Sequence, residues 1–146
     1  MLFSAQQLFS EAQAVTTTAV STNIIDLGAT GTVLNAPAAL IRDIGKGEPI
    51  DIRIQLLADA GGTTPTLVAT LEVDDNSGFS SAKIVGTSAT ITSGTEGQVV
   101  SIHWVPDGTD ERYLRLNYTT GGTTPTHSIT AGIVGARQTN ATVPGA

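Results

Sequence analysis

The sequence predicts an all-β protein: an antiparallel jelly roll or β-sandwich of about eight strands with a short N-terminal helix. Apolar and polar residues alternate with a period of two in several short segments, which is typical of strands with one buried face. Clusters of Gly, Pro, Asn and Asp separate these segments and indicate turns. At 146 residues the chain fits one domain, which can bury roughly 70% of the surface that its unfolded form exposes.

The clearest strand is expected at residues 50–56, IDIRIQL, where the isoleucines and the leucine share one face. Further strands are expected at residues 67–73, 100–104, 113–118 and 128–133, and shorter ones at 16–25 and 83–85. In the segment 100–104, the alternation places Trp104 on the apolar face together with Val100 and Ile102.

The hexapeptide GGTTPT occurs twice, at residues 61–66 and 121–126. The sequences that flank the two copies do not match over a longer period, which argues against a structural repeat. Because Gly, Thr and Pro favour turns, we expect a hairpin loop that the chain uses twice.

The chain is expected to divide into an N-terminal arm at residues 1–15, a jelly-roll β domain at 16–135 and a flexible C-terminal tail at 136–146. In the arm, Ser4 and Gln7 have the spacing of a capping box, which predicts a short helix through about Ala12. The tail shows no periodicity, so we expect it to be loose or to become ordered on a partner.

Composition excludes several classes of partner. The net charge is −6 and the seven Lys and Arg residues are scattered, so nucleic acid is not an expected partner. No apolar run approaches the 18 residues that a membrane helix needs, and the first residues do not resemble a signal peptide. We therefore expect no membrane partner and synthesis in the cytoplasm. Only 14% of residues are charged, which is common in proteins of large assemblies and in extracellular β modules.

The residues that could carry chemistry all favour a structural interpretation. His103 and His127 could hold a metal if their strands were neighbours, but no carboxylate stands beside either at ligand spacing. The segment 74–78, DDNSG, resembles the start of a calcium loop but lacks the later bidentate Glu, which favours a polar turn. In the segment 107–112, a tight turn with a surface ion pair of Arg112 is favoured over an acidic site. We expect no cofactor, no metal and no enzymatic activity.

Five segments, taken in order, resemble the small cement protein family of Bordetella-type short-tailed bacteriophages. They are residues 8–14 (LFSEAQA), 21–28 (STNIIDLG), 42–47 (RDIGKG), 108–118 (GTDERYLRLNY) and 129–134 (ITAGIV). The resemblance does not cover roughly residues 61–97 or the last ten residues. It implies a jelly-roll-like fold, homodimers, and attachment to the outer capsid surface of the virion through the major capsid protein. It implies no catalytic residues.

Two further hypotheses concern binding surfaces. Leu2, Phe3, Leu8 and Phe9 precede the expected β core, so they could anchor the chain on the capsid or on a dimer mate. The alternative, that these side chains only cover one end of the sandwich, is equally compatible with the sequence. The competing function is a carbohydrate-binding or host-attachment module, for which Tyr113 is the one plausible stacking platform.

Overall fold

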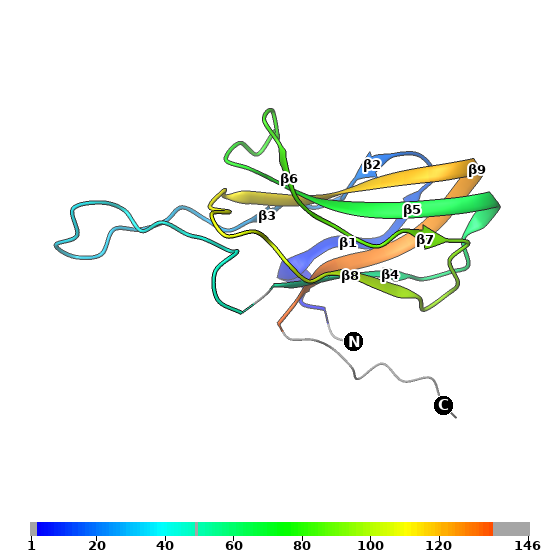
Figure 1. Cartoon of the computed structure of the whole chain (residues 1–146), viewed down its shortest axis with the longest axis horizontal. Coiled ribbons are helices and arrows are strands. Elements are labelled where there is room, and N and C mark those ends of the chain that lie inside the picture. Colours follow the sequence, from blue (N-terminus) through cyan, green and yellow to red (C-terminus); the bar gives the residue numbers. More distant parts are fainter. Residues whose placement is uncertain (1–2, 49, 136–146) are drawn as a thin grey trace, which may run out of the picture.

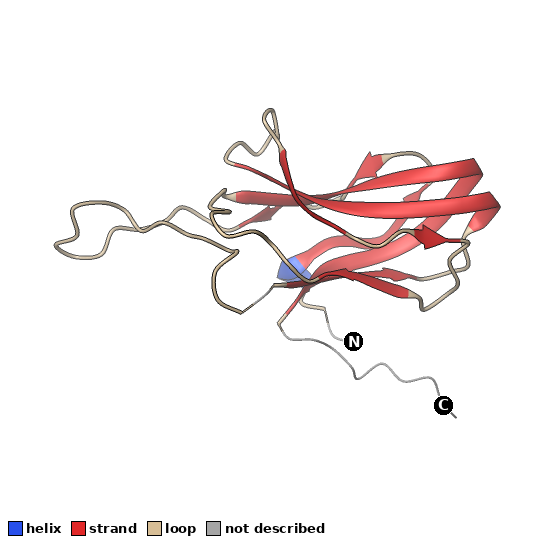
Figure 2. Cartoon of the chain, in the orientation of Figure 1, coloured by secondary structure: helices blue, strands red, loops and turns tan. Residues whose placement is uncertain are grey.

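The computed structural model describes residues 3–48 and 50–135, and it confirms the all-β prediction (Figures 1 and 2). One 3-10 turn, η1 (Ala5–Gln7), precedes nine strands. The strands are β1 (Leu8–Val15), β2 (Ala19–Val20), β3 (Ile25–Asp26), β4 (Asp51–Leu56), β5 (Gly61–Asp74), β6 (Lys83–Thr87), β7 (Ile91–Thr92), β8 (Val99–Ile102) and β9 (Tyr113–Val134).

Strand β9 belongs to both layers of the sandwich (Figure 1). Its first half pairs antiparallel with β5 and with the short strands β2 and β3. Its second half pairs antiparallel with β1 and β4. The resulting order is β6-β5-β9-β4-β8, so one long strand connects the two layers and β6 and β8 form the ends of the path.

The two GGTTPT copies are not hairpin loops, as the sequence had suggested. Each copy is a bend inside a long strand, and the two pair with each other: Gly61 lies opposite Thr126 and Thr66 lies opposite Gly121. Register shifts interrupt the pairing at Thr63, which marks β-bulges. The glycines tolerate the positive φ angles that such bends require, so the repeated sequence forms a corner of the sandwich.

The core lies between the two layers and is built mainly from aliphatic side chains. Ile52, Ile54 and Leu56 of β4 are fully buried, as the alternation in this segment predicts. The hydroxyl of Tyr118 on β9 hydrogen-bonds with Oγ of Ser10 on β1 at 2.8 Å. Burial raises the pKa of Tyr118, which keeps its phenol neutral inside the core.

The prediction of an N-terminal helix is wrong. Only the turn η1 forms, without a side-chain cap from Ser4, and the following residues enter strand β1. The side chains of Phe9 and Val15 are fully buried in the core, and β1 pairs with β9 along most of its length. Burial and strand pairing outweigh the local capping signal, so much of the expected arm is part of the sheet.

Two strand predictions also need correction. The expected strand at residues 16–25 is reduced to the two-residue strands β2 and β3. Strand β8 ends at Ile102, so Trp104 does not face the core and 66% of its surface is exposed. Val105 is buried instead of Trp104, because the strict alternation of buried and exposed side chains does not continue after Ile102.

Candidate functional site

The segment between β3 and β4 extends far from the sandwich, and we call its residues 27–48 the projecting loop (Figure 1). The amide of Leu40 donates a hydrogen bond to the carbonyl of Gly31 at 2.8 Å, and the amide of Ala36 donates to the carbonyl of Val33 at 2.9 Å. The first bond joins the two legs of the loop, and the second closes the turn at its end. The chain reverses near Asn35, which has a φ of 64°.

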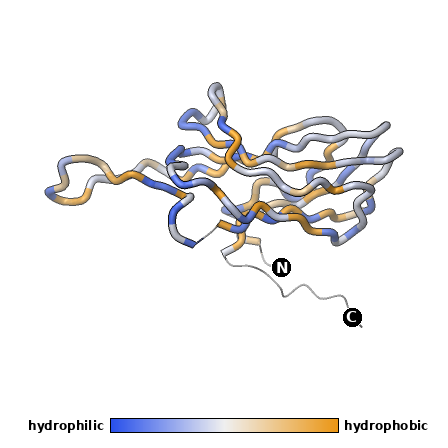
Figure 3. The backbone as a smooth tube through the Cα atoms, in the orientation of Figure 1, coloured by the Kyte–Doolittle hydropathy of each residue, from blue (hydrophilic) through white to orange (hydrophobic). Residues whose placement is uncertain are grey.

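Figure 3 shows that the backbone of the projecting loop runs through several hydrophobic residues, and four of their side chains are exposed to solvent. Leu34 is 89% exposed and Ile41 is 81% exposed, and more than half of Val33 and of Leu40 is exposed. We call these four residues the apolar tip. No residue from position 27 to 41 carries a charge. Four large apolar side chains exposed on one loop indicate an interaction surface rather than core packing.

The base of the projecting loop is fixed against the turn at residues 106–109. The carboxylate of Asp43 accepts hydrogen bonds from the amide of Gly45 at 3.0 Å and from the amide of Gly108 at 2.9 Å. These hydrogen bonds, chiefly the one from Gly108, hold the pKa of Asp43 below its usual range. A Cβ atom on Gly45 would lie 2.0 Å from the carbonyl oxygen of Pro106, so only glycine fits this contact.

An ion pair closes the same end of the sandwich. The guanidinium of Arg112 donates to both carboxylate oxygens of Asp26, at 2.6 and 2.7 Å, and its backbone amide donates to Asp75. The pairing with Arg112 lowers the pKa of Asp26 to about 2. The sequence predicted a surface ion pair of Arg112, and the structure supplies its partner from β3. Because both side chains are about 40% exposed, the pair positions these elements more than it stabilises them.

The other acidic segment forms a hairpin turn between β5 and β6. The buried carboxylate of Asp74 accepts hydrogen bonds from the amide of Asn76 at 2.9 Å and from the amide of Ser81 at 2.8 Å. These backbone donors lower the pKa of Asp74 and occupy the oxygens that a calcium ion would need. Among the residues that the structure describes, no three His, Asp or Glu side chains gather closely enough to hold a metal ion.

The two histidines are far apart. Nδ1 of His103 lies 2.7 Å from Oδ1 of Asp51, close to the pairing of Asp51 with Val134. His127 is buried where the second half of β9 begins, across from Val15. Val134 lies seven positions after His127 along the strand, which is a distance of roughly 20 Å. The two imidazoles therefore cannot share a metal ion.

The structure separates the four residues of the anchor hypothesis. Phe9 is fully buried in the core, so it is not available to a partner. Phe3 and Leu8 are half-buried over Gly132, because side-chain atoms of both lie within 3.2 Å of the position of a Cβ atom there. Leu2 lies outside the described residues, as do residues 136–146 of the expected tail.

The sequence reasoning missed both the projecting loop and the exposure of Trp104. A signal for the loop exists: residues 27–48 hold several large apolar residues without a period of two, interrupted by Gly28, Gly31 and Pro37. Tyr113, the expected sugar platform, is half-buried and lies beneath the guanidinium of Arg112, 5.0 Å from its ring centre.

The fold and the site together define a β-sandwich protein with a projecting loop. Hydrogen bonds hold this loop at its base, and its apolar side chains are exposed to solvent. A family model described as Bbp16 matches residues 9–137. The chain therefore belongs to the Bbp16 family, whose name points to a protein of Bordetella phage. A comparison with curated proteins finds no match. Within the described residues, no helix has the length and apolar character needed to cross a membrane.

Proposed function

We propose that this chain is a non-enzymatic cement (decoration) protein of a tailed-phage virion. It binds the outer capsid surface and stabilises the lattice of the major capsid protein. Membership of a phage protein family supports the setting, and the projecting loop is the observation that carries the proposal. A protein whose most exposed large apolar side chains, Leu34 and Ile41, stand on a fixed protrusion is built to dock rather than to catalyse.

A cement protein stabilises the shell because its binding is thermodynamically coupled to assembly of the lattice. Because it binds the assembled shell and not free subunits, each occupied site stabilises the lattice by about 2.7 kcal/mol at a hundredfold excess of free protein over Kd. A homodimer that contacts two shell subunits at once binds more tightly, because after the first contact the second one forms within the same complex at a high effective concentration. Contacts of modest strength, repeated over many sites, are then sufficient to resist the internal pressure of packaged DNA.

The test compares shells assembled from the phage's major capsid protein with and without saturating amounts of this chain. We expect the added chain to raise the temperature at which the shells release subunits, and to show no binding to unassembled subunits. An unchanged disruption temperature at saturation would rule out the cement role. Sedimentation equilibrium of the free chain tests the homodimer separately.

The exposure of Trp104 favours one second candidate, a carbohydrate-binding or host-attachment module. Sugars stack on exposed aromatic rings, and Trp104 offers such a ring on the surface whereas Tyr113 is covered by Arg112. A glycan array decides this point: binding that is lost in Trp104→Ala and kept in Tyr113→Ala would support the module. Absence of binding to any glycan would leave docking on the capsid as the function.

A further inference from the structure

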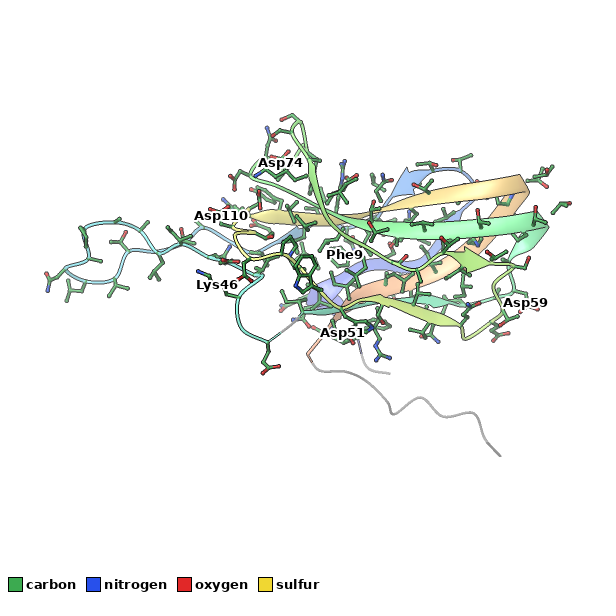
Figure 4. The ribbon with its side chains drawn as sticks, viewed as in Figure 1. Phe9, Lys46, Asp51, Asp59, Asp74 and Asp110 are labelled. Atoms are coloured by element: carbon green, nitrogen blue, oxygen red, sulfur yellow. The ribbon has the colours of Figure 1, made fainter. Side chains whose placement is uncertain are left out.

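Exposed negative charge lies at the base of the projecting loop. Asp107 lies in the turn at residues 106–109 that holds Asp43 and Ile44, Asp110 directly follows this turn, and both are exposed. No described residue donates a hydrogen bond to either carboxylate. Figure 4 shows Asp110 and Lys46 at this base, whereas Asp59 lies at the opposite end of the sandwich. The docking end is therefore apolar at its tip, and at its base it presents the exposed carboxylates of Asp107 and Asp110, which we call the rim, beside Lys46.

A second copy of this chain is a poor occupant for such a surface. All six Lys and Arg residues in the described part of the chain already contact a carboxylate or a backbone carbonyl. These contacts are Arg42 to Gly28, Lys46 to Asp43, Arg53 to Asp51, Lys83 to Glu111, Arg112 to Asp26 and Arg115 to Glu72. With a net charge of −6, two copies also repel each other at this end.

We infer that the projecting loop inserts its apolar tip into an apolar groove of the shell subunit that is flanked by Lys or Arg side chains. This inference rests on the proposed function and specifies the chemistry of the partner. The apolar tip brings no charge that would lose its hydration on insertion, since residues 27–41 are uncharged. The acidic rim then faces the basic flanks, which attract it during approach and fix the orientation of the bound chain.

The fixed base lowers the conformational entropy that the projecting loop loses on insertion. Asp43 ties the loop to Gly108, the amide of Ile44 donates to the carbonyl of Thr109 at 2.9 Å, and Gly45 packs directly against Pro106. Less conformational freedom is then lost on binding than a free loop would lose. Binding energy in protein interfaces concentrates in a few buried side chains, and Leu34 and Ile41 are the most exposed large apolar residues of the described chain.

The test measures co-sedimentation of the full chain with shells of the major capsid protein at about 50 and 500 mM NaCl. We expect the double substitution L34S/I41S to weaken binding at least about tenfold at both salt concentrations. We expect D107N/D110N to weaken binding mainly at low salt and to reduce the salt dependence that the original chain shows. The control is E96Q, which removes an exposed charge in the β7–β8 connection and should change neither quantity.

The outcomes separate this inference from the proposed function. If the original chain binds shells but L34S/I41S binds equally well, or if added salt strengthens binding, the insertion is wrong and the cement role stands. If the original chain does not bind shells at either salt concentration, both fail. Thermal unfolding of each variant is measured in parallel, because loss of binding supports the inference only in a variant that unfolds like the original chain. If L34S/I41S does not fold, the single variants L34S and I41S are measured in its place.

Discussion

Gly62 and Gly122 occupy equivalent positions in the corner that β5 and β9 form at the end of the sandwich opposite the projecting loop (Figure 1). A Cβ atom on Gly62 would lie 2.5 Å from the carbonyl oxygen of Thr124, and a Cβ atom on Gly122 would lie 2.5 Å from that of Thr64. The φ angles of the two glycines, 101° and 97°, are also nearly equal. The repeated hexapeptide thus packs against its own second copy with local twofold symmetry.

Substitution of either corner glycine should destabilise the fold. Gly62→Ala and Gly122→Ala each impose a strained backbone, which costs about 1–3 kcal/mol, and a contact with a carbonyl oxygen adds to this loss. Gly97→Ala is the control, since Gly97 also has a positive φ but no atom lies within 4 Å of its added Cβ. Chemical denaturation should show larger losses at the two corner positions. Equal losses at all three positions would contradict the reciprocal packing.

The two N-terminal phenylalanines should respond differently to substitution. Phe9→Ser removes a fully buried ring and should lower the free energy of unfolding by about 3–5 kcal/mol or more. Phe3→Ser removes a half-buried ring that covers Gly132 and should cost clearly less. Thermal unfolding of the two single variants checks this prediction. A Phe9→Ser variant as stable as the original chain would mean that the ring is not in the core.

The carboxylate of Asp43 should control the mobility of the projecting loop. Asp43→Ala removes the acceptor for the amides of Gly45 and Gly108, so both amides should exchange hydrogen faster while those of β4 and β5 do not change. Asp59→Ala is the matched control, because Asp59 accepts only the amide of Glu96 in the β7–β8 connection. If exchange at Gly108 is unaffected in Asp43→Ala, the base is not fixed by this residue.

Stability should fall in mild acid because of His127. Burial lowers the pKa of its imidazole, and the backbone of Thr66 opposes this effect only in part. Below about pH 6.5 the unfolded chain binds a proton that the folded chain refuses, so the free energy of unfolding decreases as the pH falls. Asp26, Asp43 and Asp74 have lowered pKa values, so their contributions are lost only below about pH 4.

The measurement is denaturation at intervals from pH 8 to pH 5, a range in which these three carboxylates remain ionised. The loss of stability should disappear in His127→Leu, which has no titrating group at this position. His103→Leu serves as the control, because the imidazole of His103 is half-exposed beside Asp51. A slope that persists in His127→Leu would assign the pH dependence to another group.

The alternation of apolar and polar residues correctly predicted the strands that have one buried face. Residues 52–56 alternate between core and surface as expected, with Ile52 and Ile54 inside, whereas Asp51 is buried against the expectation for its face. The helix prediction failed because capping is a local signal, whereas the burial of Phe9 depends on β9, more than a hundred residues away in the sequence. The GGTTPT copies were misread for the same reason, since only their mutual pairing makes them strand rather than loop.

The docking end could be predicted only in part. Turn chemistry indicated the hairpin at Asp74 and the ion pair of Arg112, but it could not identify Asp26 as the partner on a distant strand. The apolar residues of the projecting loop, such as Leu34 and Ile41, have the composition of a core segment. They are exposed because the loop extends away from the sandwich, and this arrangement has no local signature in the sequence.

The most direct test of the cement role is the composition of the phage particle itself. Particles of the source phage are purified by density gradient, and the band of this 14.9 kDa chain is quantified against that of the major capsid protein. A strong band in fixed ratio to the shell protein, removable without release of shell subunits, is the predicted result. A band of only a few copies per particle, or no band at all, would contradict the account.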